Sequence, residues 1–341
     1  MAASWNRRRC LALTGAGALA AAARPALGQG KSQVVISQPA DATSEGASFA
    51  ELSTYRVGGP VAVLVRGKDV DALTTVAEVA RRYRPRLLVI GRGSNLLMSD
   101  AGFSGLVVVL EGGFEAIDVP AQSPQALHAN TEALGAGGAV PLPVLARRAA
   151  AGGLAGLEFY VGIPGSVGGA VRMNAGGHGR ETVEVLRRAW VLDLLDGGGH
   201  PTASARDVVD LELDYRSSNL RPSEVVTAAE FTVTRDDPAA CEARVAEIVR
   251  WRREHQPGGQ NAGSVFRNPP GDSAGRLIEA AGLKGLRVGG AVVSDKHANF
   301  FQAEAGATAR DVLDLVAEVQ RRVAKTTGVE LVPELHVVGD D

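Results

Sequence analysis

The chain has 341 residues, 45% of them hydrophobic and 22% charged, and this balance indicates a globular protein with room for two or three domains. Its formal net charge of -2 excludes the strongly basic face that nucleic-acid-binding proteins need. Cys10 and Cys241 lie far apart in dissimilar contexts, which argues against a disulfide framework or a thiolate metal site. We therefore predict no metal site and no nucleic-acid partner.

Residues 1–28 have the pattern of an export signal. Arg7–Arg9 precede a small-residue apolar run, Cys10–Ala23, and small residues lie at cleavage-site spacing in Ala26–Gly28. The leader would be of the twin-arginine kind, and the alternative is a non-native extension from a start codon assigned too far upstream. Because the run is too short to cross a bilayer, we predict no stable membrane span. We expect segment 1–48 to be signal-like or disordered.

An α/β pattern follows. A strand is predicted at Val61–Val65, and the helix Val70–Tyr83 shows apolar residues at helical spacing behind Asp69 as N-cap. The strand Leu87–Ile90 runs directly into Gly91–Asn95, a glycine-rich turn of the kind that cradles phosphate. Taken alone, this turn fits an ordinary loop equally well.

The most unusual stretch is Val161–Gly179, in which seven of nineteen residues are glycine. It follows a predicted strand at Leu106–Leu110 and a predicted helix at Leu142–Ala150. We expect neither helix nor ordinary strand within it, because each glycine adds to the entropy lost on ordering. A flexible linker is the alternative, but apolar residues alternate with the glycines. The stretch therefore predicts a backbone that lies against a large anionic cofactor.

The second half continues with strands at Val183–Leu194 and Val225–Val233, joined by a polar connection. The amphipathic helix Pro238–His255 follows, and we place a domain boundary at its start. The remaining predicted elements are a helix, two strands, a helix with Thr308 as N-cap and a closing strand: Arg276–Ala281, Val288–Val293, Ala298–Gln302, Thr308–Lys325 and Leu331–Val338.

Three polar residues in loops or strand ends are candidates for chemistry. Arg216 can bind a carboxylate through two parallel hydrogen bonds, although a surface arginine is the commoner case. Ser264 either points into a cleft or caps a turn, and no Gly-x-Ser-x-Gly elbow surrounds it. Glu334 is either an outward residue of the closing strand or a functional one, and alternation places it on the face of Val332 and His336. Taken singly, none of the three decides a function.

Together, nine motifs in order resemble the UDP-N-acetylenolpyruvoylglucosamine reductase family, also called UDP-N-acetylmuramate dehydrogenase. The resemblance covers roughly Leu52 to Gly339, and its strength lies in the number and order of the motifs. They are Thr54–Gly59 (TYRVGG), Gly91–Leu97 (GRGSNLL), Gly162–Gly169 (GIPGSVGG), Met173–Gly176 (MNAG), Asp214–Ser217 (DYRS), Gly263–Pro269 (GSVFRNP), Ala281–Gly285 (AGLKG), His297–Phe300 (HANF) and Leu331–Gly339 (LVPELHVVG).

The resemblance implies an α+β protein with an FAD-binding domain of the vanillyl-alcohol-oxidase (PCMH) type over residues 49–237. A smaller α+β substrate-binding domain would follow over residues 238–341. The implied FAD-binding residues come from the two glycine-rich loops and the MNAG motif: Gly91, Arg92, Gly93, Ser94, Asn95, Leu96, Gly162, Ile163, Pro164, Gly165, Ser166, Gly168, Gly169, Asn174 and Gly176.

The family's three catalytic positions fall on Arg216, Ser264 and Glu334. By resemblance, NADPH reduces FAD, the flavin passes hydride to an enolpyruvyl UDP-sugar, and Ser264 supplies a proton. Arg267 and Asn268 would contact the substrate. The implied reaction is the reduction of UDP-N-acetylglucosamine enolpyruvate to UDP-N-acetylmuramate, a step of peptidoglycan precursor synthesis.

The chain departs from the family pattern at Arg172 and His178, where the family commonly has tyrosine, and both changes bear on the flavin lining. No additional tyrosine-bearing loop is evident, so the chain resembles the shorter subtype. We expect a cytoplasmic monomer, since the UDP-sugar and NADPH are cytoplasmic. The alternative is an exported FAD-dependent oxidase of the same fold that acts on an alcohol or sugar.

Overall fold

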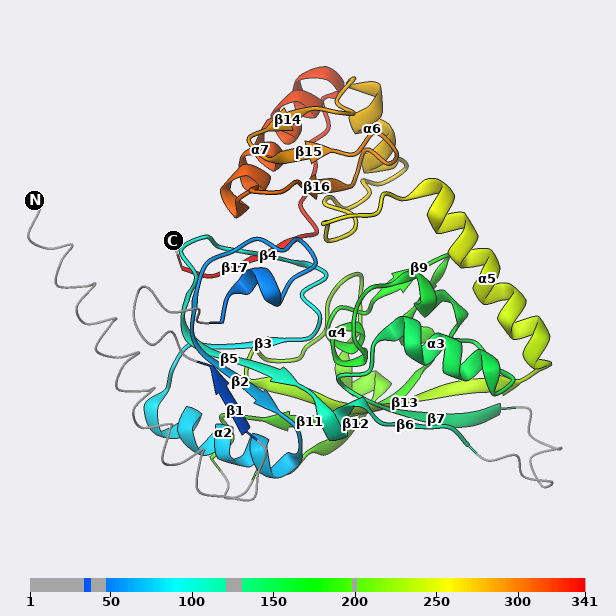
Figure 1. Ribbon diagram of the computed structural model, residues 1–341. Coiled ribbons are helices and arrows are strands. Elements are labelled where there is room, and N and C mark those ends of the chain that lie inside the picture. The colour runs from blue at the N-terminus through cyan, green and yellow to red at the C-terminus, as the bar shows by residue number, and fades with distance from the viewer. Residues whose placement is uncertain (1–33, 38–46, 121–130, 198–200, 341) are drawn as a thin grey trace, which may run out of the picture. The chain divides into compact units, whose positions relative to one another are not determined.

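The chain folds into two compact units, each described here by itself. The first contains strand β1 (Val34–Ser37), Ala62–Gly91 and Ser104–Arg250, and the second contains residues 47–61, Arg92–Phe103 and the chain from Trp251 onward. No helix in the described part of the chain has the length and apolar composition needed to cross a membrane. The computed structural model (Figure 1) describes residues 34–37, 47–120, 131–197 and 201–340.

A four-stranded sheet in the first unit has the order β1-β2-β5-β3. β1 pairs antiparallel with β2, and β3 pairs in parallel with β5. β1 lies inside segment 1–48, which was expected to be signal-like or disordered; the rest of that segment up to residue 46 lies outside the described residues. The strands are β1 (Val34–Ser37), β2 (Val61–Gly67), β3 (Leu87–Ile90) and β5 (Phe103–Leu110).

Helix α2 (Val70–Tyr83) confirms its predicted bounds and cap. The Asp69 side chain accepts a hydrogen bond from the backbone N–H of Ala72 at 2.7 Å, which satisfies one of the donors that every helix start leaves open. Leu73, Val76 and Ala77 are buried on one face and pack with β2 and β5. The amphipathic spacing therefore accounts for the packing of this helix against the sheet.

A six-stranded sheet forms the rest of the first unit, in the order β12-β11-β13-β7-β6, with β8 beside β13. Helices α3 and α4 lie on it in Figure 1, and their apolar residues share one buried core with β7, β11, β13 and Cys241 and Val245 of α5. The elements are β6 (Ile117–Asp118), β7 (Thr131–Gly137), α3 (Leu142–Ala151), β8 (Leu154–Ala155), α4 (Val167–Arg172), β9 (Gly176–Gly177), β10 (Arg180–Glu181), β11 (Leu186–Asp193), β12 (Ser204–Asp207), β13 (Glu224–Arg235) and α5 (Pro238–His255).

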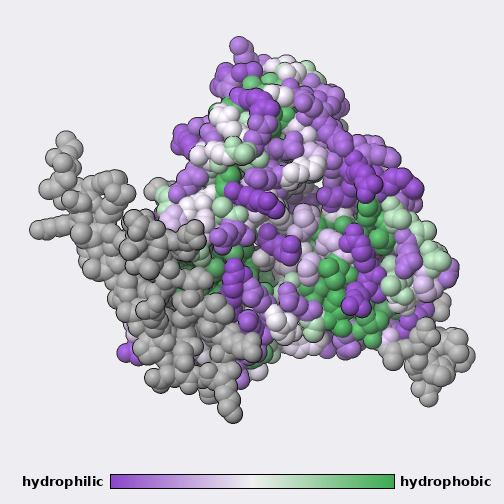
Figure 2. Space-filling view, viewed as in Figure 1, coloured by the Kyte–Doolittle hydropathy of each residue, from purple (hydrophilic) through white to green (hydrophobic). Residues whose placement is uncertain are grey.

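Helix α5 has the predicted bounds, and Cys241 and Val245 on its predicted inner face are buried. Hydrophilic residues gather over its outer side (Figure 2). The division between the two units lies inside this helix, between Arg250 and Trp251. The domain boundary at residue 238 remains a prediction. A sequence pattern shows where a helix begins, but it does not show at which residue of the helix the tertiary contacts change from one unit to the other.

One predicted strand of the first unit is corrected, and one strand was not predicted. The stretch predicted as one strand, Val183–Leu194, begins with a 3-10 helix, Thr182–Glu184, and β11 starts only at Leu186. The polar connection after β11 contains the edge strand β12, whose side chains are largely exposed. Edge strands need no continuous apolar run, so the apolar pattern of β12 was too weak to detect.

The second unit is a small α+β assembly. Its three-stranded sheet has the order β14-β15-β16, and β4 pairs in parallel with β17. The Thr308 cap is confirmed, since its side chain accepts from the N–H of Asp311 at 3.1 Å. The elements are β4 (Leu96–Met98), α6 (Ala274–Ala280), β14 (Arg287–Val288), β15 (Ala291–Val293), β16 (Phe301–Ala303), α7 (Ala309–Thr327) and β17 (His336–Val338).

Two predicted strands of this unit are also corrected. The stretch Val288–Val293 is a hairpin, because the chain turns at Gly289, whose φ is +53°. A Cβ there would lie 2.0 Å from Asp311 Oδ1, so glycine is required. The closing strand is only His336–Val338; Glu334 precedes it, and Pro333 forms an isolated bridge with Phe266.

The core of the second unit draws on both ends of the chain. Tyr55, Val57 and Leu97 are buried together with apolar residues of α6, α7 and β16. The TYRVGG and GRGSNLL motifs therefore pack in the same core as the C-terminal elements. The apolar character of a residue does not indicate which of two cores it joins. The sequence analysis therefore placed Tyr55, Val57 and Leu97 in the continuous first domain.

Glu224, the first residue of β13, holds a buried ion cluster in the first unit. Only 1% of its side chain is exposed, and it pairs with Arg206 of β12 and with Arg221 at 2.9 Å. Its carboxylate also accepts the backbone N–H of Arg221 at 2.6 Å. Burial by itself would raise the pKa of Glu224, but the hydrogen bonds from Arg206 and Arg221 outweigh burial and lower the pKa from 4.5 to about 2.

We predict that Glu224→Gln lowers the free energy of unfolding by about 3 kcal/mol at pH 7, because it removes the buried carboxylate that both Arg206 and Arg221 stabilise in its charged form. A depressed carboxyl pKa stabilises the fold above pH 4.5, and this contribution disappears as the pH falls toward 2. Urea denaturation of both proteins from pH 7 to pH 2.5 should show the difference shrinking with acidity. The exposed pair at Glu304 provides the control: Glu304→Gln should cost much less. An equal cost would contradict the argument.

Candidate active site

The first glycine-rich loop begins where β3 ends. Gly91 belongs to the first unit, and a Cβ at this position would lie 2.4 Å from Ser166 Oγ of the second glycine-rich loop. The structure therefore brings the start of one predicted cofactor loop against the other. Residues Arg92–Leu96 belong to the second unit, where Gly93 has φ +58° and a Cβ would meet the carbonyl oxygen of Leu52 at 2.1 Å.

Backbone hydrogen bonds join the second loop, Gly162–Gly169, to residues 138–142 at the start of α3. The N–H of Gly168 donates to the carbonyl of Gly138 at 2.8 Å, and the N–H of Leu142 donates to the carbonyl of Gly165 at 3.0 Å. Ser166 is 2% exposed. Together these bonds hold the loop, including Ile163 and Pro164 between its glycines, in one backbone conformation.

The expectation that this glycine-rich stretch forms neither helix nor strand was wrong. Gly168 and Gly169 lie within helix α4, and Gly176 and Gly177 form β9. The Ser166 side chain caps α4 by accepting from the N–H of Gly169 at 3.4 Å. Burial of its Val and Ala residues stabilises a short helix that glycine propensity alone would not.

Asn174, predicted as a cofactor residue, uses its side chain within the protein. It is 1% exposed with φ +40°. Its Nδ2 donates to Glu181 Oε2 at 3.0 Å and to the carbonyl of Asp214 at 3.2 Å, and its Oδ1 accepts from the N–H of Val183 at 2.9 Å. Any contact of Asn174 with a cofactor would therefore come from its backbone rather than from its amide.

Arg216 occupies the corner of a tight turn in the first unit. The backbones of Asp214 and Ser217 exchange two hydrogen bonds, of 3.3 and 3.1 Å, and Arg216 between them has φ +52°. Its Nη1 donates to the carbonyl of Asn174 at 3.4 Å, and 19% of its side chain is exposed. The guanidinium also lies over the Tyr215 ring, 4.8 Å from the centroid. The turn therefore directs this cation toward the MNAG segment.

Ser264 and Glu334 lie on neighbouring segments of the second unit. The N–H of Glu334 donates to the carbonyl of Val265 at 2.7 Å, and Ser264 forms a bridge with Phe300. Asn95 joins the same group, because its Nδ2 donates to the carbonyl of Glu334 at 3.4 Å and its carbonyl accepts from the N–H of His336 at 3.1 Å. The structure thus brings two of the three predicted catalytic residues together with one predicted cofactor residue.

The two predicted substrate residues are exposed beside Ser264. The N–H of Arg267 donates to the carbonyl of Val332 at 2.9 Å. Asn268 Oδ1 accepts from the N–H of Ala274 at the start of α6, at 3.1 Å. The charges of Arg267 and Glu334 also act on the ring of His336. Burial lowers the pKa of this histidine, Arg267 lowers it further, and Glu334 raises it.

Sequence reasoning missed Asn299, which fixes the Ser264 segment. This residue is 3% exposed, its Nδ2 donates to the carbonyl of Phe266 at 2.8 Å, and its Oδ1 accepts from the N–H of Phe266 at 2.9 Å. The HANF motif that contains Asn299 was noticed, but only as part of a resemblance. A polar residue within an apolar strand pattern was the available signal.

The two departures from the family pattern have different surroundings. Arg172 donates to three carbonyls, those of Leu220, Arg221 and Glu224, at 3.2, 2.7 and 3.0 Å. Burial lowers the pKa of Arg172, and the nearby Glu224 carboxylate offsets part of this effect. His178 is exposed at the β9–β10 turn with φ +53°.

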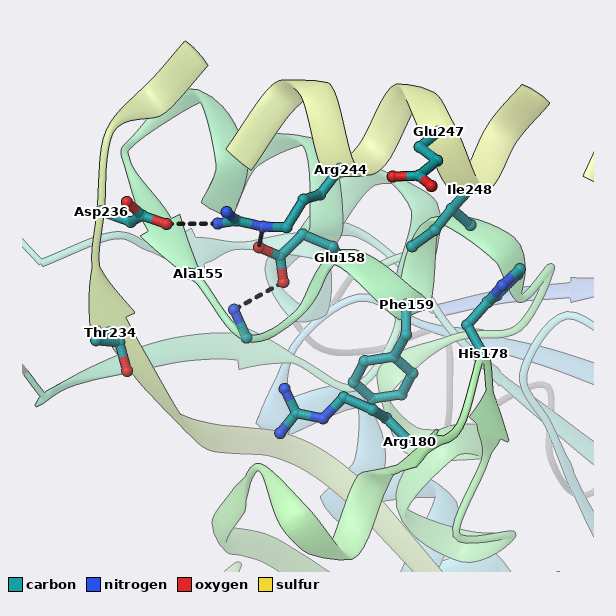
Figure 3. A pocket seen from close by; sticks show the side chains of 11 residues that line it. Ala155, Glu158, Phe159, His178, Arg180, Thr234, Asp236, Arg244, Glu247 and Ile248 are labelled. Carbon is teal, nitrogen blue, oxygen red and sulfur yellow. Dashed lines mark hydrogen bonds and ion pairs between the residues drawn. The ribbon is translucent and has the colours of Figure 1, made fainter. Parts of the chain in front are cut away.

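A cavity of about 550 Å³ in the first unit has His178, Arg180 and Phe159 on one side and Arg244 on the other (Figure 3). None of the predicted site residues lines it. Arg244 bridges two carboxylates there, Glu158 at 2.8 Å and Asp236 at 2.7 Å (Figure 3). Glu158, Asp236 and Glu247 line the cavity together with Arg180 and Arg244, so it has no excess positive charge for an anionic cofactor.

The residues around the first loop fit a bound polar cofactor. Within the described residues, Thr54 Oγ1 and Tyr55 Oη are buried and have no hydrogen-bond partner, and burial raises the pKa of Tyr55. Buried hydroxyl groups without a partner are costly, and both lie in the motif whose backbone contacts Gly93. A ligand with many acceptor atoms, such as a dinucleotide, would satisfy them.

Comparison with known proteins agrees with this geometry. The family "UDP-N-acetylenolpyruvoylglucosamine reductase, C-terminal domain" matches residues 255–338, and "FAD binding domain" matches residues 61–198. These matches confirm the predicted α+β fold class with its FAD-binding domain.

Relatives named UDP-N-acetylenolpyruvoylglucosamine reductase include those of Paramagnetospirillum magneticum (42% identical, 86% of this chain and 91% of the relative) and Rubrobacter xylanophilus (40%, 84% and 92%). The crystal structure of the enzyme of that name from Thermus caldophilus is also similar: TM-score 0.73, 34% identity, 90% of this chain and 99% of that one.

We predict that Gly93→Ala destabilises the protein by at least about 2 kcal/mol, since a side chain at φ +58° would also meet the Leu52 carbonyl. Bound flavin per protein should fall with it. Thermal unfolding and the absorbance ratio at 450 and 280 nm measure the two effects. Gly258→Ala is the matched control, because a Cβ there meets nothing within 4 Å. Equal behaviour of the two variants would show that the Gly93 backbone tolerates a side chain.

Proposed function

The chain belongs to the UDP-N-acetylenolpyruvoylglucosamine reductase family, and on that premise we propose that it reduces UDP-N-acetylglucosamine enolpyruvate to UDP-N-acetylmuramate with electrons from NADPH. The protein is an FAD-dependent oxidoreductase. The observation that carries the proposal is that Arg216, Ser264 and Glu334 occur together with both glycine-rich loops in a chain that aligns with these enzymes over more than four fifths of its length.

FAD held by this chain would supply the hydride chemistry that links NADPH to C3 of the enolpyruvyl ether. The residues proposed to hold FAD are Gly91–Leu96 and the loop Gly162–Gly169, with Gly176 and the Asn174 backbone. Support comes from the partnerless hydroxyls of Thr54 and Tyr55 and from the tight backbone contacts of Gly93. Glycine at such positions lets N–H groups approach phosphate oxygens directly.

Addition of hydride at C3 drives negative charge toward C2 and the substrate carboxylate. We assign Arg216 and Glu334 to bind and polarise this carboxylate, so that charge developing in the transition state meets preorganised partners. In this contact Glu334 would take the role of hydrogen-bond donor through a carboxyl O–H, because two carboxylates have only acceptor atoms. Ser264 would give its hydroxyl proton to C2, which completes the addition of H⁻ and H⁺ across the double bond.

Arg267 and the Asn268 amide nitrogen are proposed to bind the UDP-sugar, with the Asn268 oxygen engaged at the start of α6. The assigned roles require Arg216, Ser264 and Glu334 to act on the same substrate molecule. We place the reaction in the cytoplasm, where UDP-sugars and NADPH are found. The expected monomeric state remains a prediction.

The direct test is anaerobic consumption of NADPH by the purified FAD-loaded protein. Addition of UDP-N-acetylglucosamine enolpyruvate should oxidise one NADPH per substrate and yield a product heavier by two hydrogens. An exported oxidase, the rival interpretation, would need oxygen and an alcohol or sugar and would leave NADPH untouched. The family relationship supports the reductase. Absence of substrate-dependent NADPH oxidation would overturn the proposal.

We predict that Ser264→Ala slows formation of the product by about 100- to 10,000-fold, the range for loss of a positioned proton donor. Reduction of the flavin by NADPH should stay within about twofold of the parent, because that step does not use this proton. Stopped-flow absorbance at 450 nm separates the two half-reactions.

The control for this prediction is Thr326→Ala, which removes an exposed hydroxyl of α7 that donates to the Arg322 carbonyl at 2.9 Å. It should change neither half-reaction. Parent-like product formation by Ser264→Ala would show that another group protonates C2.

A further inference from the structure

Glu181, at the end of the β9–β10 hairpin, lies against Arg216. One carboxylate oxygen, Oε1, is 3.5 Å from Arg216 Nη1, and the other, Oε2, accepts from Asn174 Nδ2 at 3.0 Å. Glu181 was not among the candidate residues taken from the sequence. All three residues lie in the first unit, so their arrangement does not depend on how the two units are placed.

Two of the contacts of Arg216 meet the same atom of its guanidinium. Nη1 is the atom that meets both the Glu181 carboxylate and the carbonyl of Asn174. A Cβ at Gly176 would lie 3.4 Å from this same Nη1 and 2.9 Å from Glu181 Cγ. A guanidinium held at Nη1 and lying over the Tyr215 ring, 4.8 Å from its centroid, is restricted in both direction and plane.

We propose that Glu181 is a positioning residue that orients the Arg216 guanidinium for the substrate carboxylate. The inference rests on the proposed function, in which Arg216 binds that carboxylate. An arginine at φ +52° on a turn has many rotamers available to its long side chain. The carboxylate of Glu181 and the carbonyl of Asn174 restrict them before substrate binds, and this preorganisation lowers the entropy lost in the complex.

A purely structural role for Glu181 is the competing explanation. Glu181 also caps the 3-10 helix Thr182–Glu184: its side chain accepts from the N–H of Glu184, and Glu184 Oε1 accepts from the N–H of Glu181 at 2.7 Å. Glu184 thus takes part in the same capping box but pairs with Arg180 at 3.2 Å, and no ion pair joins it to Arg216 among the described residues. It is the matched control.

The test compares Glu181→Gln with Glu184→Gln in the FAD-loaded protein. Glu181→Gln keeps an acceptor oxygen for the cap but removes the charge that faces Arg216. We expect kcat/KM for UDP-N-acetylglucosamine enolpyruvate to fall about tenfold, mostly through KM, as for loss of one hydrogen bond to a charged group. The rate of flavin reduction by NADPH and the melting temperature should stay near those of the parent. Glu184→Gln should leave kcat/KM unchanged.

A double-mutant cycle with Arg216→Ala identifies the route of the effect. If Glu181 acts through Arg216, adding Glu181→Gln to Arg216→Ala should change kcat/KM less than twofold. An unchanged KM in Glu181→Gln alone, or the same tenfold loss in the Arg216→Ala background, would overturn the proposal.

Crystal structures of both glutamine variants test, independently of turnover, whether Glu181 orients Arg216. The guanidinium of Arg216 should leave the carbonyl of Asn174 in Glu181→Gln and keep it in Glu184→Gln. The same guanidinium position in both variants would overturn the positioning role. If the parent does not turn over the enolpyruvyl substrate, the proposed function fails, and these structures still show whether Glu181 orients Arg216.

Discussion

The buried side-chain amide of Asn174 is the interaction on which the candidate site in the first unit depends. A buried amide that lost its partners would cost about 1–3 kcal/mol per group, so its three hydrogen bonds act together. They join the hairpin at Glu181, the start of the 3-10 helix at Val183 and the Asp214 end of the Arg216 turn. The left-handed backbone of Asn174, with φ +40°, is one that asparagine adopts more readily than most residues. One residue therefore ties a predicted catalytic arginine to the glycine-rich loop region.

A second buried asparagine has the corresponding place in the second unit. Asn299 pairs with both backbone groups of Phe266, in the manner of a neighbouring strand, and so holds the segment of Ser264. Asn95 Nδ2 donates to the carbonyl of Glu334 at 3.4 Å. In both units the candidate catalytic residues are thus exposed or half-buried, while hydrogen bonds from neighbouring asparagine side chains fix the backbone that carries them. Such sites keep their geometry because packing and hydrogen bonds fix the backbone before any ligand binds.

The sequence predicted regular elements well where local signals agree. The bounds of α2 and α5 and the caps Asp69 and Thr308 follow from apolar spacing and capping chemistry. Helix α4 was not predicted because tertiary burial overrides glycine propensity. The hairpin at Gly289 was not predicted because its turn depends on one glycine with a positive φ, which a strand pattern does not reveal. The placement of Tyr55 and Leu97 in the second core depends on long-range packing that no local pattern records. Glu181 was missed because a glutamate after a polar hairpin looks like any surface residue.

The most direct test of this account is hydrogen exchange in Asn174→Gly, which removes the amide while allowing the left-handed backbone. If Asn174 joins the hairpin to the Arg216 turn, amide exchange in residues 175–184 and 211–219 should accelerate together, by about tenfold or more. Exchange in α2 should stay at the parent rate, since its cap and core contacts do not involve this residue. Unchanged exchange in either segment would contradict the claim that one buried amide holds both.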